Sequence, residues 1–169
     1  LFLLTVTDSF ALSVQEDTTS NKRKAEMLFI EGKTFELKNN FLGAIENYKT
    51  ALQYDKAAGI YYALGSLYYY LGKYEDAAQY IKKSLEVSPQ NAEYLERLSQ
   101  TYIGLNDYQK AAETIEKIMT IDSNYTYGLY TLARLYQELK MPSRAITIYE
   151  KITDKIGYDY EVLRKMYDI

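Results

Sequence analysis

The chain has 169 residues, with 20 basic and 23 acidic side chains that leave a net charge of −3. This balance excludes the strongly basic surface on which nucleic-acid binding depends. The absence of cysteine and histidine excludes disulfides, thiol nucleophiles, Ser-His-Asp arrangements and imidazole or thiolate metal sites. No Gly-rich phosphate loop and no calcium-binding loop occurs either. We therefore expect a protein that is not an enzyme and that carries no cofactor and no metal.

Residues 1–12 form a short apolar stretch that ends in small residues at Ser9-Phe10-Ala11. Such a stretch is typical of the tail of a secretory signal peptide, and it is too short to cross a bilayer. Residues 13–24 are polar and are expected to form a disordered linker, in which the basic run at 22–24 is the solvated lead-in to the first helix. This pattern favours export to the periplasm or the extracellular space. The alternative is the frayed tail of a cytoplasmic protein.

A small residue and an aromatic residue recur together along the chain at a spacing of 33 or 34 positions. The small residue is Ala44, Ala77, Ala111 and Ala145, and the aromatic stands nine positions ahead of it as Phe35, Tyr68, Tyr102 and Tyr136. A fixed period of this length is the signature of a helical repeat array, whose units stack to bury a continuous apolar face. The period divides the chain into four units at residues 25–57, 58–91, 92–125 and 126–157.

Each unit is expected to contain two helices separated by a turn. Positions four, seven, eight and eleven of a unit lie on one face of its first helix, and turn residues such as Asn39-Asn40 and Asn106-Asp107 follow that helix. The predicted helices are 25–38, 41–54, 58–71, 74–87, 92–104, 108–121, 126–139 and 142–155, with a ninth that begins near Tyr158.

Other positions of the units also agree in chemistry. Position four carries a large apolar residue, and the small position eight reads Gly32, Gly65, Ser99 and Ala133. This pattern resembles the tetratricopeptide repeat, a 34-residue helix–turn–helix. The resemblance implies an all-α fold, a right-handed superhelical α-solenoid of antiparallel helix pairs. Among the departures from the pattern, the proline that ends a repeat is present only in the second unit, as Pro89. Glu31 is polar at an otherwise apolar position, as expected of a solvent-facing first unit.

Residues 158–169 continue the period. A fifth unit would begin at Tyr160, with Leu163 and Met166 at its positions four and seven. We expect this segment to be either the start of a fifth repeat or a capping helix. The open end and the lack of an initiator methionine favour a chain that is the front part of a longer protein. An uncapped end could also mediate self-association.

The resemblance places the first helix of every unit on the inner, concave surface of the solenoid, with positions two, five, nine and twelve exposed there. The candidate peptide-binding residues are Phe29, Lys33, Tyr62, Tyr69, Tyr70, Glu93, Glu96, Tyr127, Tyr130 and Arg134. Tyrosines supply contact area and a hydroxyl group, which suits an extended peptide or an inserted helix. The pair Glu93 and Glu96 would prefer a basic residue in that ligand. In the alternative interpretation, tyrosines at positions two and five pack between adjacent first helices.

A non-catalytic scaffold that binds a peptide or protein segment in the concave groove is the leading functional hypothesis. The alternative is a sensory or regulatory input region of a longer protein with an effector domain beyond residue 169. Carbohydrate binding or hydrolysis is disfavoured, because nothing places two carboxylates in one pocket. Chaperone-binding members of the family carry a Lys and Asn clamp on their first two units. The matching positions here are Phe29, Lys33, Tyr62 and Ser66, so a chaperone co-factor is also disfavoured.

Overall fold

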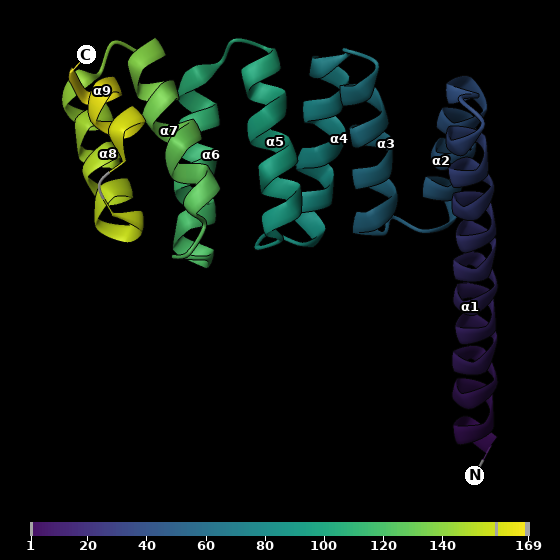
Figure 1. Ribbon diagram of the computed structural model, residues 1–169. Coiled ribbons are helices and arrows are strands. Elements are labelled where there is room, and N and C mark those ends of the chain that lie inside the picture. The colour runs from purple at the N-terminus through teal and green to yellow at the C-terminus, as the bar shows by residue number, and fades with distance from the viewer. Residues whose placement is uncertain (1, 158, 168–169) are drawn as a thin grey trace.

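The computed structural model describes the backbone of residues 2–157 and 159–167, and the side chains of residues 17–155, 157 and 159–166. The regular structure of this part of the chain is α-helical, and the helices follow one another in a single row (Figure 1). The helices are α1 (Phe2–Leu37), α2 (Phe41–Tyr54), α3 (Ala58–Tyr70), α4 (Tyr74–Val87), α5 (Ala92–Gly104), α6 (Tyr108–Ile121), α7 (Thr126–Glu138), α8 (Pro142–Ile156) and α9 (Tyr160–Tyr167).

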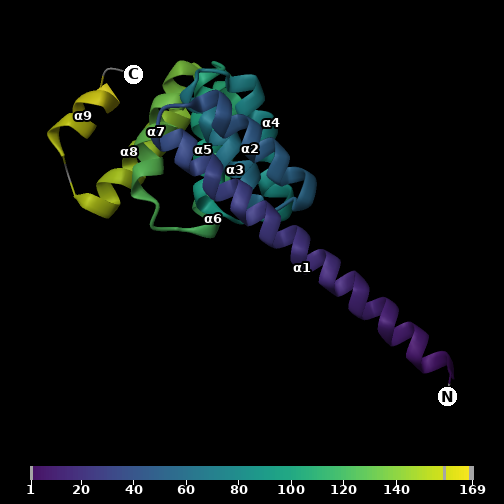
Figure 2. The ribbon, with the colours of Figure 1, turned by 90° about the vertical axis from the view of Figure 1, so that its right-hand side faces the viewer.

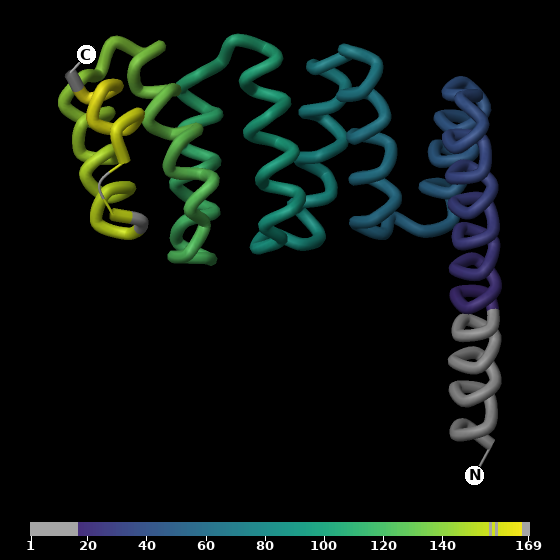
Figure 3. Tube along the Cα trace, viewed as in Figure 1, coloured from purple at the N-terminus to yellow at the C-terminus, as the bar shows by residue number. Residues whose placement is uncertain are grey.

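The boundaries of α2 to α8 agree with the predicted ones to within one residue. The start of α1 is different, because residues 17–24 of the expected disordered linker are helical and exposed, beyond the end of α2 (Figure 3). This stretch contains no proline or glycine that would end a helix, and Lys24 Nζ lies 4.3 Å from the ring centroid of Tyr54 at the end of α2. The predicted signal-peptide remnant, residues 1–12, lies outside the residues whose side chains are described.

Two kinds of helix contact predominate in the array. The two helices of each unit pack together, and the second helix of each unit then contacts the first helix of the next. The short helix α9 contacts α8, at the end of the array opposite the N-terminus (Figure 1 and Figure 2). Each unit therefore buries its apolar face against a neighbour, which is how such arrays are stabilised. Within the described residues, no helix is long and apolar enough to cross a membrane.

The repeated alanines lie where the two helices of a unit approach most closely. Ala44, Ala77, Ala111 and Ala145 are all fully buried. The small position eight of the first helix faces this contact: a Cβ atom on Gly65 would lie 2.7 Å from Ile81 Cγ1 and 3.1 Å from the backbone nitrogen of Ile81. The periodic small residues are thus explained by the close approach of the two backbones.

The repeated aromatics at position eleven join each unit to the one before it. The ring centroid of Tyr68 lies 5.9 Å from Lys49 Nζ on α2, and that of Tyr102 lies 5.6 Å from Lys82 Nζ on α4. The Tyr136 hydroxyl donates a hydrogen bond of 2.5 Å to Glu116 Oε1 on α6. A buried tyrosine with a polar contact to the preceding unit therefore recurs at each of these three junctions.

A left-handed residue separates the two helices of every unit. The four residues recur at the same position, as Asn39 (φ 57°), Gly72 (φ 70°), Asn106 (φ 57°) and Lys140 (φ 56°). Asn and Gly adopt this conformation most readily. In the first and third units the next residue, Asn40 or Asp107, then accepts a hydrogen bond from a backbone N–H in the first turn of the second helix.

Candidate functional site

Three adjoining hollows lie on the face of the array that α1, α3, α5, α7 and α9 line, which we call the groove face. The first, the α1–α3 hollow, has a volume of about 480 Å³ and is lined by residues that include Glu36, Phe41, Ser66, Tyr69, Tyr70 and Arg97. The middle, the α5–α7 hollow, has about 310 Å³ and is lined by residues that include Tyr69, Glu96, Gln100, Tyr125, Tyr127 and Arg134. The last, the α7–α9 hollow, has about 360 Å³ and is lined by residues that include Tyr127, Tyr130, Arg134, Gln137, Tyr149 and Lys165.

Shared side chains join the three hollows into one continuous surface. Tyr69 lines both the α1–α3 hollow and the α5–α7 hollow. Tyr127, Thr131 and Arg134 line both the α5–α7 hollow and the α7–α9 hollow. Six of the ten candidate residues line at least one hollow, namely Tyr69, Tyr70, Glu96, Tyr127, Tyr130 and Arg134. The other four, Phe29, Lys33, Tyr62 and Glu93, line none of these three.

The first-unit candidates Phe29 and Lys33 contact residues of their own unit. The Phe29 ring lies 5.6 Å from that of Tyr48, and Lys33 Nζ lies 3.1 Å from Glu36 Oε2. The Tyr48 hydroxyl donates to the same oxygen at 2.6 Å. Burial, helped by the Glu36 carboxylate, raises the pKa of Tyr48. The negative charge of Glu36 at the edge of the α1–α3 hollow is therefore already compensated by Lys33 and Tyr48.

Tyr62 packs between two first helices, as the alternative interpretation expected. Its ring stacks on that of Tyr94 at 4.5 Å, which joins α3 to α5. Burial raises the pKa of Tyr62 and the carboxylate of Glu93 adds to the rise, while Arg97 and Ser66 act in the opposite direction. This tyrosine therefore stabilises the contact between the second and third units.

Tyr69 and Tyr70 lie side by side in sequence but have different surroundings. Tyr69 is half-buried, with its ring 5.5 Å from that of Tyr74 and 4.9 Å from the guanidinium carbon of Arg97. Tyr70 is 71% exposed, although its ring lies 5.3 Å from that of Phe41. Tyr69 thus has a fixed position in the lining that two hollows share, and Tyr70 offers an exposed aromatic surface at the rim of the first.

Arg97 is a groove residue that sequence reasoning missed. It is half-buried, and its Nη1 donates to Gln100 Oε1 at 2.8 Å, whereas its Nε is buried without a hydrogen-bond partner. Among the described residues, no carboxylate lies within 4.0 Å of its guanidinium. Arg97 occupies position six of its unit, which is not one of the positions expected to be exposed on the concave surface (two, five, nine and twelve). A cation beside the buried positions of a first helix was the signal available in the sequence.

Tyr125 is the second groove residue that sequence reasoning missed, because it lies just before α7, the first helix of the fourth unit. Burial raises its pKa to about 12, and the Glu96 carboxylate contributes to the rise. Its ring lies 6.4 Å from that of Tyr127 in an edge-on arrangement. The half-buried Tyr125 therefore supports the exposed Tyr127, which is 67% accessible, at the junction of two hollows.

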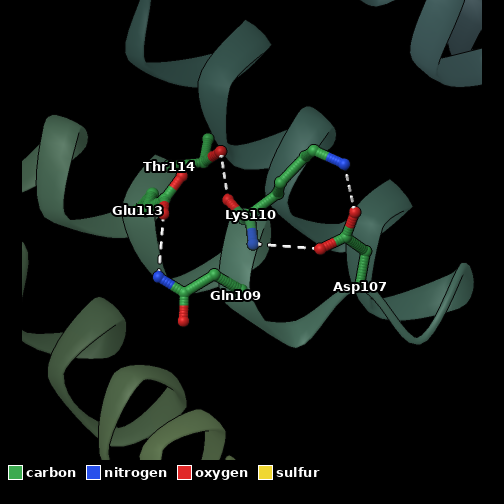
Figure 4. Close-up of polar contacts among 5 residues, drawn as sticks. All are labelled: Asp107, Gln109, Lys110, Glu113 and Thr114. Atoms are coloured by element: carbon green, nitrogen blue, oxygen red, sulfur yellow. Dashed lines mark hydrogen bonds and ion pairs between the residues drawn. The ribbon is translucent and has the colours of Figure 1, made fainter.

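The polar groups of α6 contrast with the cations of the groove face. Lys110 Nζ lies 2.5 Å from Asp107 Oδ2, and Gln109 donates to Glu113 at 2.8 Å (Figure 4). The Lys110 ammonium holds the pKa of Asp107 below its usual value. No ion pair of this kind is found for Arg134 or Lys165 within the part of the chain that the structure describes. The groove face therefore keeps charged groups available to a ligand.

The described residues contain no cluster of acidic side chains that could hold a metal ion.

The fold and the three hollows define a class of protein: a helical solenoid with an elongated, hollowed surface of tyrosines and cations along its first helices. Two sequence models of the tetratricopeptide repeat family match the chain, at residues 62–125 and 127–155. The chain belongs to the tetratricopeptide repeat family, as its repeat predicted. No curated protein matches the sequence significantly.

Solved structures of the family share the fold. A crystal structure of MamA protein has a TM-score of 0.71 at 24% identity, over 78% of this chain and 72% of that one. YrrB, described as a TPR protein with an unusual peptide-binding site, has a TM-score of 0.72 at 18% identity, over 90% and 79%. The first TPR of Spaghetti (RPAP3), bound to an HSP90 peptide, has a TM-score of 0.65 at 18% identity, over 70% and 95%. At these identities the likeness establishes the solenoid fold.

Proposed function

We propose that this protein is a non-catalytic scaffold that binds a peptide or protein segment along its groove face. The observation that carries the proposal is the continuity of the three hollows, which Tyr69 and Tyr127 join without a break. An elongated ligand can therefore contact successive units, as peptide ligands do in other helical grooves. Two of the solved relatives are described with a bound peptide or a peptide-binding site, which supports the same kind of ligand.

The exposed tyrosines provide the contact area for such a ligand. Tyr70, Tyr127 and Tyr130 are exposed, and each lines a hollow. Rigid aromatic side chains beside a hollow are the residues that most often dominate binding energy at interfaces. Tyrosine also adds a hydroxyl group that can donate to the backbone carbonyls of an extended chain.

Selection of random 12-residue peptides on the immobilised protein tests this proposal. We expect enriched peptides to bind at least about tenfold more weakly to a Tyr70→Ala, Tyr127→Ala, Tyr130→Ala variant, because hot-spot truncations cost more than about 1 kcal/mol each. The matched control carries alanine in place of three exposed apolar residues outside the three hollows, Leu42, Val87 and Ile121. Equal binding of the enriched peptides to both triple variants, each checked for unchanged helicity, would contradict the proposal.

A further inference from the structure

Several hydrogen-bond donors that line the α7–α9 hollow have no partner in the described part of the chain. Arg134 and Lys165 are both exposed, come from different helices and form no ion pair with a described residue. No aspartate or glutamate lines this hollow. The two cations therefore create a local positive charge at one end of the groove face, although the whole chain has a net charge of −3.

The neutral groups of the same hollow reinforce this donor character. The Tyr149 hydroxyl donates to Gln137 Oε1 at 3.3 Å, so the amide oxygen is occupied and the amide nitrogen remains a free donor. No hydrogen bond of the Tyr127 or Tyr130 hydroxyl occurs among the described residues, and each can donate one. Guanidinium, ammonium, amide and hydroxyl donors thus all line a space of about 360 Å³.

We propose that the α7–α9 hollow binds the side-chain carboxylate of an aspartate or glutamate in the partner peptide, between Arg134 and Lys165. This inference rests on the proposed function and names the chemistry of the ligand. A carboxylate has only acceptor oxygens, which match a lining of donors, and the planar fork of one guanidinium fits one carboxylate. The single arginine of the hollow argues for a carboxylate over a phosphate, whose larger charge is usually met by a cluster of arginines.

The charges elsewhere on the groove face set the place of this acidic residue. Glu96 lines the α5–α7 hollow, where a second carboxylate would be repelled. Arg134 lines both that hollow and the α7–α9 hollow, so the acidic residue belongs on the side of Arg134 away from Glu96. The partner segment is thus acidic where it contacts α9 and is not acidic where it passes α5.

Fluorescence anisotropy with four labelled mixtures of 12-residue peptides tests the inference on the full chain. One central position is fixed as Glu, Gln, Lys or phosphoserine, and the other positions are randomised identically. We expect the Glu mixture to bind about tenfold more tightly than the Gln mixture, since hydrogen bonds to an ionised carboxylate are stronger than those to a neutral amide. This preference is expected to disappear in an Arg134→Gln, Lys165→Gln variant.

The matched control is a Lys117→Gln, Lys151→Gln variant, which removes the same charge from exposed positions outside the three hollows. We expect it to keep the preference for Glu. Equal binding of the Glu and Gln mixtures, or a Glu preference that survives Arg134→Gln, Lys165→Gln, would overturn the inference and leave the proposed function standing. Tighter binding of the phosphoserine mixture than of the Glu mixture would overturn the choice of carboxylate. Failure of all four mixtures to bind would overturn the proposed function as well.

Discussion

The small residue at position eight can be tested with two glycines of the same helix. Gly65 faces α4, and an added Cβ atom would lie 2.7 Å from Ile81 Cγ1, 3.1 Å from the nitrogen of Ile81 and 3.2 Å from the carbonyl oxygen of Ala77. Two of these atoms belong to the backbone of α4, and Ile81 is fully buried, so none can move away freely. An added Cβ atom on Gly59, also in α3, would meet no atom within 4 Å.

Alanine at either position gains helix propensity, about 0.5–1 kcal/mol relative to glycine. At Gly59, in the first turn of α3, at least part of this gain is expected, so Gly59→Ala raises the free energy of unfolding. At Gly65 the overlap with α4 costs about 1–3 kcal/mol, as overpacked cores do, so Gly65→Ala lowers the free energy of unfolding. We expect the two variants to differ by about 2 kcal/mol.

Urea unfolding followed by circular dichroism measures both variants against the wild-type chain. Each variant carries the same glycine-to-alanine change in the same helix, so propensity and composition are matched. A Gly65→Ala variant that is as stable as Gly59→Ala would refute the argument that the close approach of α3 and α4 leaves no room for a Cβ atom at Gly65.

Three further results are expected. Asp107→Ala removes the cap of α6 and should lower the free energy of unfolding by about 1 kcal/mol in urea unfolding, whereas Asp154→Ala, at an exposed position within α8, should leave it nearly unchanged. Arg97→Met should change the free energy of unfolding by less than about 1 kcal/mol, because the lost contact with the Tyr69 ring is offset by removal of a half-buried charge that forms no ion pair. The same variant should nevertheless weaken peptide binding measured by fluorescence anisotropy. The pKa of Tyr125 is raised to about 12 in the folded protein, so the unfolded chain loses this proton first, and stability should fall as the pH rises from about 10 to 12. Because the pKa values of Tyr48 and Tyr62 are raised as well, Tyr125→Phe should lessen that fall without abolishing it in unfolding curves recorded at about pH 9 and 11, and an unchanged slope would argue against the assignment.

The repeat predicts the fold closely because the period constrains every unit at once. Ala77 and Ala111 occupy equivalent close contacts, and the left-handed Asn39 and Asn106 fall at equivalent turns. The early start of α1 lies outside the repeat, where no period exists to indicate helix or coil. Polar residues alone suggested a linker there, but they are equally compatible with an exposed helix.

The groove face was harder to predict, because side-chain direction depends on how successive units are rotated. Tyr62 and Tyr130 occupy the same position of their units, yet Tyr62 stacks on Tyr94 while Tyr130 is exposed in a hollow. The difference arises from the neighbour that follows: α5 supplies an aromatic partner to Tyr62. Arg97 lines the α1–α3 hollow from position six of its unit, which the repeat pattern does not predict to be exposed.

Paramagnetic relaxation enhancement is the measurement that tests most directly whether a ligand lies along the groove face. A peptide from the Glu mixture, labelled with a nitroxide at its centre, would be added to the full chain enriched in nitrogen-15. We expect the amide signals of α5, α7 and α9 to broaden and those of the second helices α2, α4 and α6 to remain sharp. Stronger broadening on α2, α4 and α6 would place the peptide on the opposite face and contradict the account.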